Sequence, residues 1–132
     1  MLHHIGIIGP SLSWAYSTDM LRFSDLVDEV HDVVQGNRIY IFSAPNQSPL
    51  LELVVPDNIS STVSGTLRRR GAGLHHLGYL VSDLDEAVST AMAVPGTVLL
   101  NQYSLVVPSF GGPIRTRFVY QSGQLIEFLV AA

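Results

Sequence analysis

The chain has no cysteine, little charge and no long apolar run, and each absence excludes a class of protein. Without cysteine there is no disulfide framework, no thiolate zinc site and no cysteine nucleophile, which fits the cytoplasmic location that we predict. No apolar run approaches the roughly 18 residues that a transmembrane helix needs. The N-terminal stretch MLHHIGIIGPS lacks the basic flank of a signal peptide. We therefore expect an unprocessed protein without a membrane partner.

Basic side chains are also scarce, with seven against eleven acidic ones and a net charge of −4. This balance argues against a nucleic-acid partner. Apolar residues make up 47% of the 132 residues and charged residues 14%, so a folded chain is expected. Its length predicts one domain, which buries roughly two-thirds of its unfolded surface. The weakly polar surface favours a small-molecule cleft, and we predict a homodimer.

A faint internal repeat organises the sequence. HHLGYLVSDLDEA at residues 75–87 follows the pattern of HHIGIIGPSLSWA at residues 3–15. The interval is too long for a solenoid unit and too short for a separate domain. The repeat therefore indicates two halves of one fold.

Each half has the same expected order of elements, a strand, a helix and three further strands. In the first half, the strand LHHIGII precedes a helix over residues 11–23, and turns QGNR and PNQS separate the extended runs 26–34, 39–44 and 50–55. In the second half, LHHLGYLV precedes a helix opened by Ser82, and the extended runs are 98–107, 114–120 and 125–130. We predict a single α+β domain over residues 1–132, built from βαβββ modules at 1–57 and 73–132. The linker 58–72 is expected to hold one or two helical turns.

Two carboxylates occupy matching places in the last strand of each half. Glu52 lies within LLELVV and Glu127 within LIEFLV, and their interval nearly equals that from His4 to His76. A carboxylate inside an apolar strand is costly to bury unless it is paired, hydrogen-bonded or bound to a cation. Two such residues at equivalent positions are not explained as ordinary solvent-exposed side chains.

Strand alternation separates the histidines of each pair. If the apolar residues around them face the helix, His4 and His76 face the other side of the sheet, while His3 and His75 are expected to pack. Gly6 and Gly78, each two residues after a candidate ligand, would leave space beside each imidazole for another group, such as a metal-bound substrate.

A metal site follows as a hypothesis from these four residues. The candidate ligands are His4, Glu52, His76 and Glu127. Two imidazoles with one or two carboxylates suit Zn²⁺, Fe²⁺, Mn²⁺, Co²⁺ or Ni²⁺ and leave positions for water or substrate.

The duplicated modules resemble the vicinal oxygen chelate superfamily, which includes glyoxalases, bleomycin-resistance proteins and dioxygenases. HHIGI opens one half, GLHHLGYLVSDLDEAV opens the next and LIEFL closes the chain. Within that superfamily, RRRGAGLHHLGYLVSDLDEA is most similar to methylmalonyl-CoA epimerases, and LLELVVP, VVQGNRIYIF and PSFGGPIRTRFVYQSGQLIEFL support the match. The resemblance covers essentially the whole chain.

The resemblance implies a glyoxalase-like fold, a curved mixed sheet around a metal-binding cleft. It implies that His4, His76 and Glu127 bind a divalent metal, with Glu52 at a further ligand position. In the epimerases the metal holds a thioester enolate while a carboxylate removes the α-proton and another group returns it on the opposite face. Glu127 would then be ligand and base together, and the substrate would be a small molecule such as an acyl-CoA.

The sequence departs from the epimerase pattern at the second catalytic glutamate. This residue is expected before the QG turn, but the chain reads VDEVHDVVQG and places His31 there, with Glu29 and Asp32 nearby. His31 could act as a base near neutral pH. The alternatives are an exposed histidine on a polar strand face and a different reaction.

Two arginine groups are candidates for binding substrate anions. Arg68 to Arg70 could contact CoA phosphates, or could be a solvated helix end whose charges complement the helix dipole. Arg115 and Arg117, two residues apart on one strand face, are a second candidate.

Three kinds of function remain open from the sequence. The first is a metal-dependent isomerase or lyase that acts through an enolate, with an epimerase favoured over a glyoxalase. The second is a ring-cleaving dioxygenase, which the short two-module chain disfavours. The third is a non-catalytic binding protein of the bleomycin-resistance type, although such proteins usually lose the ligand set that this chain keeps.

Overall fold

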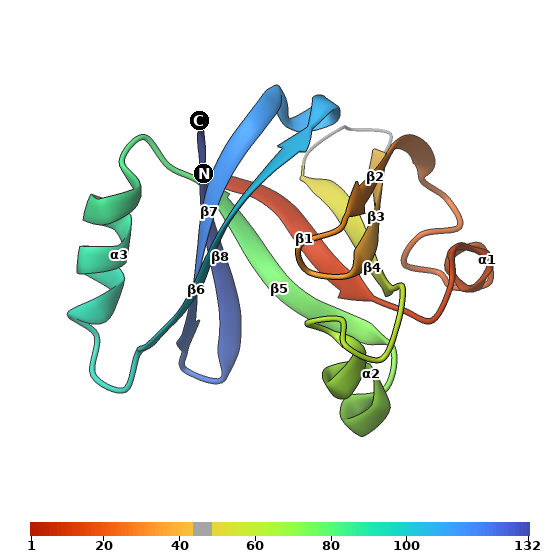
Figure 1. Cartoon of the computed structure of the whole chain (residues 1–132), viewed down its shortest axis with the longest axis horizontal. Helices are drawn as coiled ribbons and strands as arrows, with labels where there is room; N and C mark the ends of the chain where they lie inside the picture. The colour runs from red at the N-terminus through yellow and green to blue at the C-terminus, as the bar shows by residue number, and fades with distance from the viewer. Residues whose placement is uncertain (44–48) are drawn as a thin grey trace. The chain divides into compact units, whose positions relative to one another are not determined.

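The computed structural model describes residues 1–43 and 49–132, so the predicted turn at 45–48 lies outside the described residues. In chain order, the elements are β1 (Leu2–Ile8), α1 (Leu12–Ala15), β2 (Asp25–Asp32), β3 (Asn37–Ser43), β4 (Leu50–Pro56), α2 (Ser64–Arg70), β5 (Gly73–Leu80), α3 (Leu84–Met92), β6 (Val98–Val107), the 3₁₀ turn η1 (Pro108–Phe110), β7 (Gly112–Gln121) and β8 (Gln124–Ala131) (Figure 1). They form two compact units: one is Ile5–His75, and the other combines Met1–His4 with His76–Ala132.

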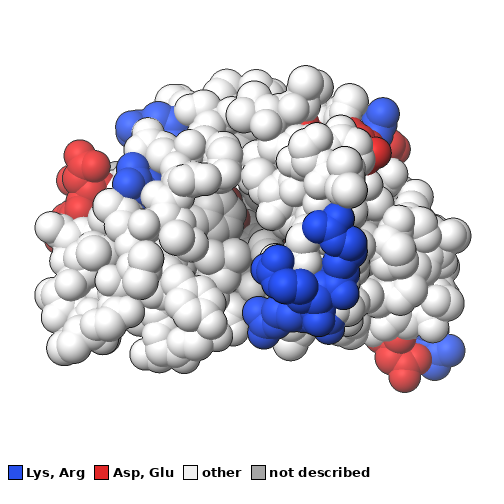
Figure 2. Space-filling view, turned by 60° about the horizontal axis from the view of Figure 1, so that its bottom comes forward, with Lys and Arg blue, Asp and Glu red and all other residues white. Residues whose placement is uncertain are grey.

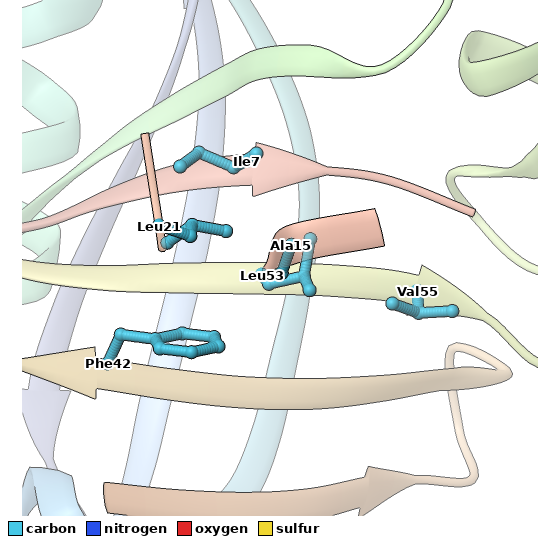
Figure 3. Packing of buried hydrophobic residues seen from close by; sticks show 6 residues of the cluster. All are labelled: Ile7, Ala15, Leu21, Phe42, Leu53 and Val55. Atoms are coloured by element: carbon cyan, nitrogen blue, oxygen red, sulfur yellow. The ribbon is translucent and has the colours of Figure 1, made fainter. Parts of the chain in front are cut away.

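In the unit Ile5–His75, β2, β3 and β4 form antiparallel neighbours and β1 lies beside β4. The amide of Gly9, just after β1, donates a hydrogen bond to the carbonyl of Val54 at 3.2 Å. One face of these strands carries the hydrophobic core, whose members come from α1, the strands and the segment after α1: Ile7, Ala15, Leu21, Phe42, Leu53 and Val55 (Figure 3). Burial of each large apolar side chain contributes about 1.5–3 kcal/mol.

Helix α1 is much shorter than the helix predicted over residues 11–23. It starts as predicted, because the Ser11 side chain accepts a hydrogen bond from the amide of Trp14, but it ends at Ala15. The Ser17 hydroxyl donates to the Trp14 carbonyl at 2.7 Å, and the Thr18 hydroxyl accepts from the Met20 amide at 3.4 Å. Such side-chain bonds to nearby backbone groups compete with helix formation.

In the other unit, the strand order is β5-β8-β7-β6, with β5 parallel to β8 and the remaining pairs antiparallel. The order β1-β4-β3-β2 in the first module is the same arrangement, so the internal repeat of the sequence is also a repeat of topology. Helix α3 packs against β7 and β8. Asp83, rather than the predicted Ser82, caps this helix, since its side chain accepts from the Glu86 amide at 3.0 Å.

Helix α2 lies in the segment where the sequence predicts one or two helical turns. Val63 and Leu67 pack against Ile8 and Val54, and the helix ends at Gly71, whose φ of 81° favours glycine. Among the described residues, no helix combines the length and the apolar character that crossing a membrane requires.

Candidate metal centre

Three of the four predicted ligands converge in the unit that combines Met1–His4 with His76–Ala132. Nε2 of His4 lies 3.1 Å from Nε2 of His76 and 2.9 Å from Oε1 of Glu127. Nε2 of His76 lies 3.4 Å from the same Glu127 oxygen. All three side chains are buried, with at most 6% of their residue surface exposed. The atoms that face one another are therefore two imidazole nitrogens and one carboxylate oxygen.

The register of β5 and β8 places His76 and Glu127 on one face. Gly78 is opposite Glu127 in this parallel pair, and His76 lies two residues earlier on the same face. Phe118 of β7, also opposite Glu127, places its ring edge-on to His76 with centroids 5.8 Å apart. The Phe118 ring therefore flanks the polar cluster on the same face of the sheet.

Gly78 is required by the close approach of His4. A Cβ atom at position 78 would overlap the His4 imidazole ring. The sequence-based expectation that this glycine leaves space for a substrate is wrong, because the space is filled by the ring of the other histidine. Gly78 therefore brings the two histidines of the two repeats together.

The spacing of the three ligand atoms fits a single divalent ion. At metal–ligand distances of about 2.0–2.1 Å, neighbouring ligands lie about 3.3 Å apart in a tetrahedral site and about 2.9 Å apart in an octahedral one. The observed separations of 2.9, 3.1 and 3.4 Å cover this range. Two neutral nitrogens with a carboxylate form a donor set for Zn²⁺, Co²⁺, Ni²⁺, Mn²⁺ or Fe²⁺.

The electrostatics of the cluster keep Glu127 ionised. Burial by itself raises the pKa of its carboxyl group, but hydrogen bonds and charge interactions from His4 and His76 outweigh burial and hold the pKa far below its usual range. An ionised carboxylate is the form that binds a cation. It is also a weak base, so it can remove a proton only from a strongly activated carbon.

His3, predicted to be a packing residue, contacts both His4 and Phe110. Its Nδ1 lies 2.9 Å from Nδ1 of His4, and the Phe110 ring stands edge-on to it with centroids 4.5 Å apart. If His4 binds a metal through Nε2, its Nδ1 carries the proton and donates it to His3, which fixes the tautomer of the ligand. The HH pair in the sequence was the only signal for this contact. Strand alternation placed the two histidines on opposite faces, so the contact was not predicted.

Replacing His3 with phenylalanine tests this role. We expect metal affinity to fall by about 10–100-fold, since the ring shape is kept but the acceptor for His4 is lost. Titration of the purified protein with Co²⁺ measures the effect. An unchanged affinity would show that His3 only packs against Phe110.

Glu52, the fourth predicted ligand, lies on β4 in the unit Ile5–His75. It is opposite Ile41 of β3 and is 7% exposed. Its burial within an apolar strand matches that of Glu127. Its place in the ligand set is part of the proposal below.

His31 lies on the face of the first module opposite to Glu52. His31 is paired with Arg38 of β3, and Arg38 is paired with Val55 of β4. These residues therefore lie on the face that carries the hydrophobic core. Nε2 of His31 lies 2.5 Å from Oδ2 of Asp57, and Arg38 pairs with the other oxygen of Asp57 at 3.4 Å. This arrangement connects β2 to the end of β4 and gives no support to His31 as a second base beside Glu52.

The two arginine groups differ in their surroundings. Arg115 and Arg117 lie on the face of β7 opposite to Glu127, and Arg117 donates to Gln102 at 3.2 Å. They therefore do not belong to the ligand cluster. Arg68 to Arg70 occupy the last turn of α2, and Figure 2 shows one larger group of basic side chains besides several isolated ones.

Comparisons with known proteins identify the fold and the family. A profile of the Glyoxalase/Bleomycin resistance protein/Dioxygenase superfamily matches residues 3–103. Methylmalonyl-CoA epimerase from Mycobacterium tuberculosis is 26% identical with a TM-score of 0.76, over 99% of this chain and 87% of that chain. A hypothetical protein from Bacillus halodurans is 23% identical with a TM-score of 0.78, over 100% of this chain and 94% of that one.

A third structure contains a ligand. It is a variant of Streptomyces coelicolor methylmalonyl-CoA epimerase in complex with 2-nitronate-propionyl-CoA, 22% identical with a TM-score of 0.73, over 99% of this chain and 96% of that chain. A search of curated proteins found no match. The predicted α+β, glyoxalase-like fold is confirmed by these neighbours. With most of its length matched by the family profile, the chain belongs to the Glyoxalase/Bleomycin resistance protein/Dioxygenase superfamily.

Proposed function

We propose that the protein is a divalent-metal-dependent epimerase that inverts a carbon next to a thioester carbonyl. The observation that carries this proposal is the buried cluster of His4, His76 and Glu127, whose ligand atoms are spaced as around one ion. The likeness to methylmalonyl-CoA epimerases supports the choice of reaction within the superfamily.

The ligands in this proposal are Nε2 of His4, Nε2 of His76 and Oε1 of Glu127, with Glu52 as the fourth. Glu52 is included because a carboxylate buried among leucine and valine needs a cation or another partner. It is also the counterpart of Glu127 in the repeat. When bound, the metal supplies a Lewis acid for the thioester oxygen.

Glu127 also acts as a base in this proposal. Oε1 is the oxygen that faces both imidazoles, so Oε2 is the atom to which we assign the α-proton. The lowered pKa of Glu127 keeps it ionised but makes it a weak acceptor. Proton removal therefore depends on electrophilic activation of the substrate.

Metal analysis and proton exchange test the proposal together. The purified protein is expected to hold about one divalent ion per chain, and to exchange the α-proton of methylmalonyl-CoA with solvent deuterium while inverting the centre. Treatment with a chelator should abolish exchange, and added Co²⁺ or Zn²⁺ should restore it. Exchange that survives complete metal removal contradicts the proposal.

Further assays distinguish this function from the other functions found in the superfamily. Glyoxalase chemistry predicts turnover of a hemithioacetal without thioester exchange, and ring cleavage predicts oxygen uptake with a catechol. A binding protein of the bleomycin-resistance type predicts tight ligand binding by a metal-free chain with no turnover. The predicted homodimer is checked in the same preparation by light scattering.

The patch Arg68 to Arg70 is our candidate for the phosphates of an acyl-CoA. Its three guanidinium groups form no ion pair with a described acidic residue. Replacing all three with alanine is expected to raise KM for methylmalonyl-CoA by about 10-fold, since three exposed charge contacts of about 0.5 kcal/mol each add up to about 1.5 kcal/mol. The kcat is expected to stay within about twofold.

Two controls make this arginine test specific. The KM for methylmalonyl-pantetheine, which lacks the nucleotide phosphates, should be unchanged in the triple variant. Arg115→Ala, on the face opposite to Glu127, should leave both KM values unchanged. Equal losses with both substrates would show that the patch does not contact the phosphates.

A further inference from the structure

We propose that Thr116 is a specificity-determining residue of the site. Its hydroxyl donates a hydrogen bond to an oxygen that the substrate's acyl group carries in addition to the thioester carbonyl. This inference rests on the proposed epimerase function and adds to it the residue that recognises the polar end of the acyl group. Thr116 and the three converging ligands all lie in the unit that combines Met1–His4 with His76–Ala132.

The pairing of β7 with β8 places Thr116 on the face of the ligand cluster. Thr116 is opposite Leu129, and Phe118 is opposite Glu127. Directly paired residues project from the same face, so Thr116 and Glu127 are diagonal neighbours at about 7–8 Å. A substrate carbon that gives its proton to Glu127 can therefore carry an oxygen within reach of the Thr116 hydroxyl.

The Thr116 hydroxyl is buried without a hydrogen-bond partner. The residue is 1% exposed, and within residues 1–43 and 49–132 no donor or acceptor forms a hydrogen bond with Oγ1. Most buried hydroxyl groups are paired, because an unpaired one costs free energy that a valine of the same shape avoids. A substrate oxygen can supply the missing partner.

The internal repeat shows that packing does not require a hydroxyl at this position. In the first module, Glu52 is opposite Ile41, and Ile39, two residues earlier on β3, is opposite Val54. Ile39 is therefore the counterpart of Thr116, and it is a buried aliphatic residue with 5% of its surface exposed. Of the two equivalent positions, the hydroxyl occurs at the one whose module holds His76 and Glu127.

Aromatic side chains border Thr116 on the same face. Tyr103 of β6 is opposite Thr116, and its own hydroxyl accepts a hydrogen bond from the Asn101 side-chain amide at 3.1 Å. The Phe118 ring stands edge-on to Tyr103, with centroids 6.1 Å apart. In such surroundings a hydrogen bond to a charged oxygen is stronger than in water. A carboxylate, which only accepts hydrogen bonds, is the group that best matches the Thr116 hydroxyl.

Thr116→Val tests the inference, because valine keeps the shape and removes the hydroxyl. The KM for methylmalonyl-CoA is expected to rise about 10–100-fold, the usual effect of losing a hydrogen bond to a charged group. Isobutyryl-CoA, in which a methyl group replaces the carboxylate, should inhibit the wild-type protein and the variant with the same Ki. The change in KM without a change in Ki is the result that a hydrogen bond to the carboxylate predicts.

Thermal melting of the metal-loaded protein gives a second readout that needs no turnover. Without substrate, Thr116→Val should melt at or above the wild-type temperature, since an unpaired buried hydroxyl has been removed. Malonyl-CoA should raise the melting temperature of the wild type more than that of the variant, because the tighter complex is stabilised more. Isobutyryl-CoA should raise both melting temperatures equally.

Two further variants control the experiment. Thr116→Ser keeps the hydroxyl and should hold the KM close to the wild-type value. Thr90→Val removes an exposed hydroxyl from α3 and should change neither the KM nor the Ki. If the valine variant folds poorly, Thr116→Ala removes the same hydroxyl and should show the same difference between the KM and the Ki.

Two results would overturn the inference. The first is an unchanged KM for methylmalonyl-CoA in a folded Thr116→Val or Thr116→Ala protein. The second is an equal rise in the KM and in the Ki of isobutyryl-CoA, since this would mean that the substitution only disturbs packing.

The test also separates the role of Thr116 from the function on which it rests. If the wild-type holoprotein neither exchanges nor inverts methylmalonyl-CoA, the proposed epimerase function fails and the role of Thr116 fails with it. If the wild-type protein inverts this substrate and the Thr116 variants match it, only the recognition of the carboxylate by Thr116 is wrong.

Discussion

Replacing His76 with alanine is expected to yield a folded protein that no longer retains its metal and has lost its activity. The substitution removes one of the three ligand atoms that lie within 3.4 Å of one another. Loss of an outer hydrogen-bond partner already weakens metal binding by about 10–100-fold, so loss of a ligand should weaken it more. Because Lewis-acid activation is worth several kcal/mol, the exchange rate should fall more than about 1000-fold.

The adjacent histidine provides the control for this variant. His75→Ala removes an imidazole from the next position of β5, on the opposite face of the strand. Metal content and deuterium exchange should remain within about threefold of the wild type. Metal analysis by mass spectrometry and exchange by NMR measure both quantities. Full metal occupancy in the His76 variant would show that His76 is not a ligand.

The second large effect is expected from Gly78→Ala, which adds one methyl group beside the His4 ring. The added Cβ would overlap the His4 imidazole. His4 is fully buried, so the ring cannot swing into solvent without leaving the cluster. Overpacking of this kind costs about 1–3 kcal/mol of stability, and displacement of His4 should reduce metal retention as severely as His76→Ala.

Gly65→Ala is the matched glycine substitution. Gly65 lies within α2, where an added Cβ would come near the Arg69 guanidinium, the far end of a flexible side chain. Alanine stabilises a helix interior by roughly 0.5–1 kcal/mol relative to glycine, so this variant should keep its metal and melt at or slightly above the wild-type temperature. Thermal melting and metal titration compare the two variants. If the Gly78→Ala protein held a full complement of metal, the cluster would not depend on the close approach of the His4 ring to Gly78.

The duplicated fold could be predicted from the sequence because its signals are local and occur twice. Strand alternation, the turn residues and the cap-like start of each helix specify the order of elements without knowledge of distant contacts. The candidate ligands were found in the same way, since a polar residue in an apolar strand is conspicuous and its repetition more so. The end of α1 was missed because the Ser17 and Thr18 side chains bond to the backbone of Trp14 and Met20 instead of continuing the helix.

What the sequence determined by itself is the family, the two-module topology and three of the residues that the structure brings together, His4, His76 and Glu127. The tertiary structure decided the details that depend on one residue of register or on an approach between distant strands. Gly78 accommodates the His4 ring, and the neighbouring His3 contacts that ring through Nδ1. A bulge in β2 between Leu26 and Asp28 places Asp28 on the face of Glu52 and His31 on the opposite face. The physical reason is that the side-chain period of a strand is two, so a single bulge exchanges its faces, and local sequence does not mark where the bulge occurs.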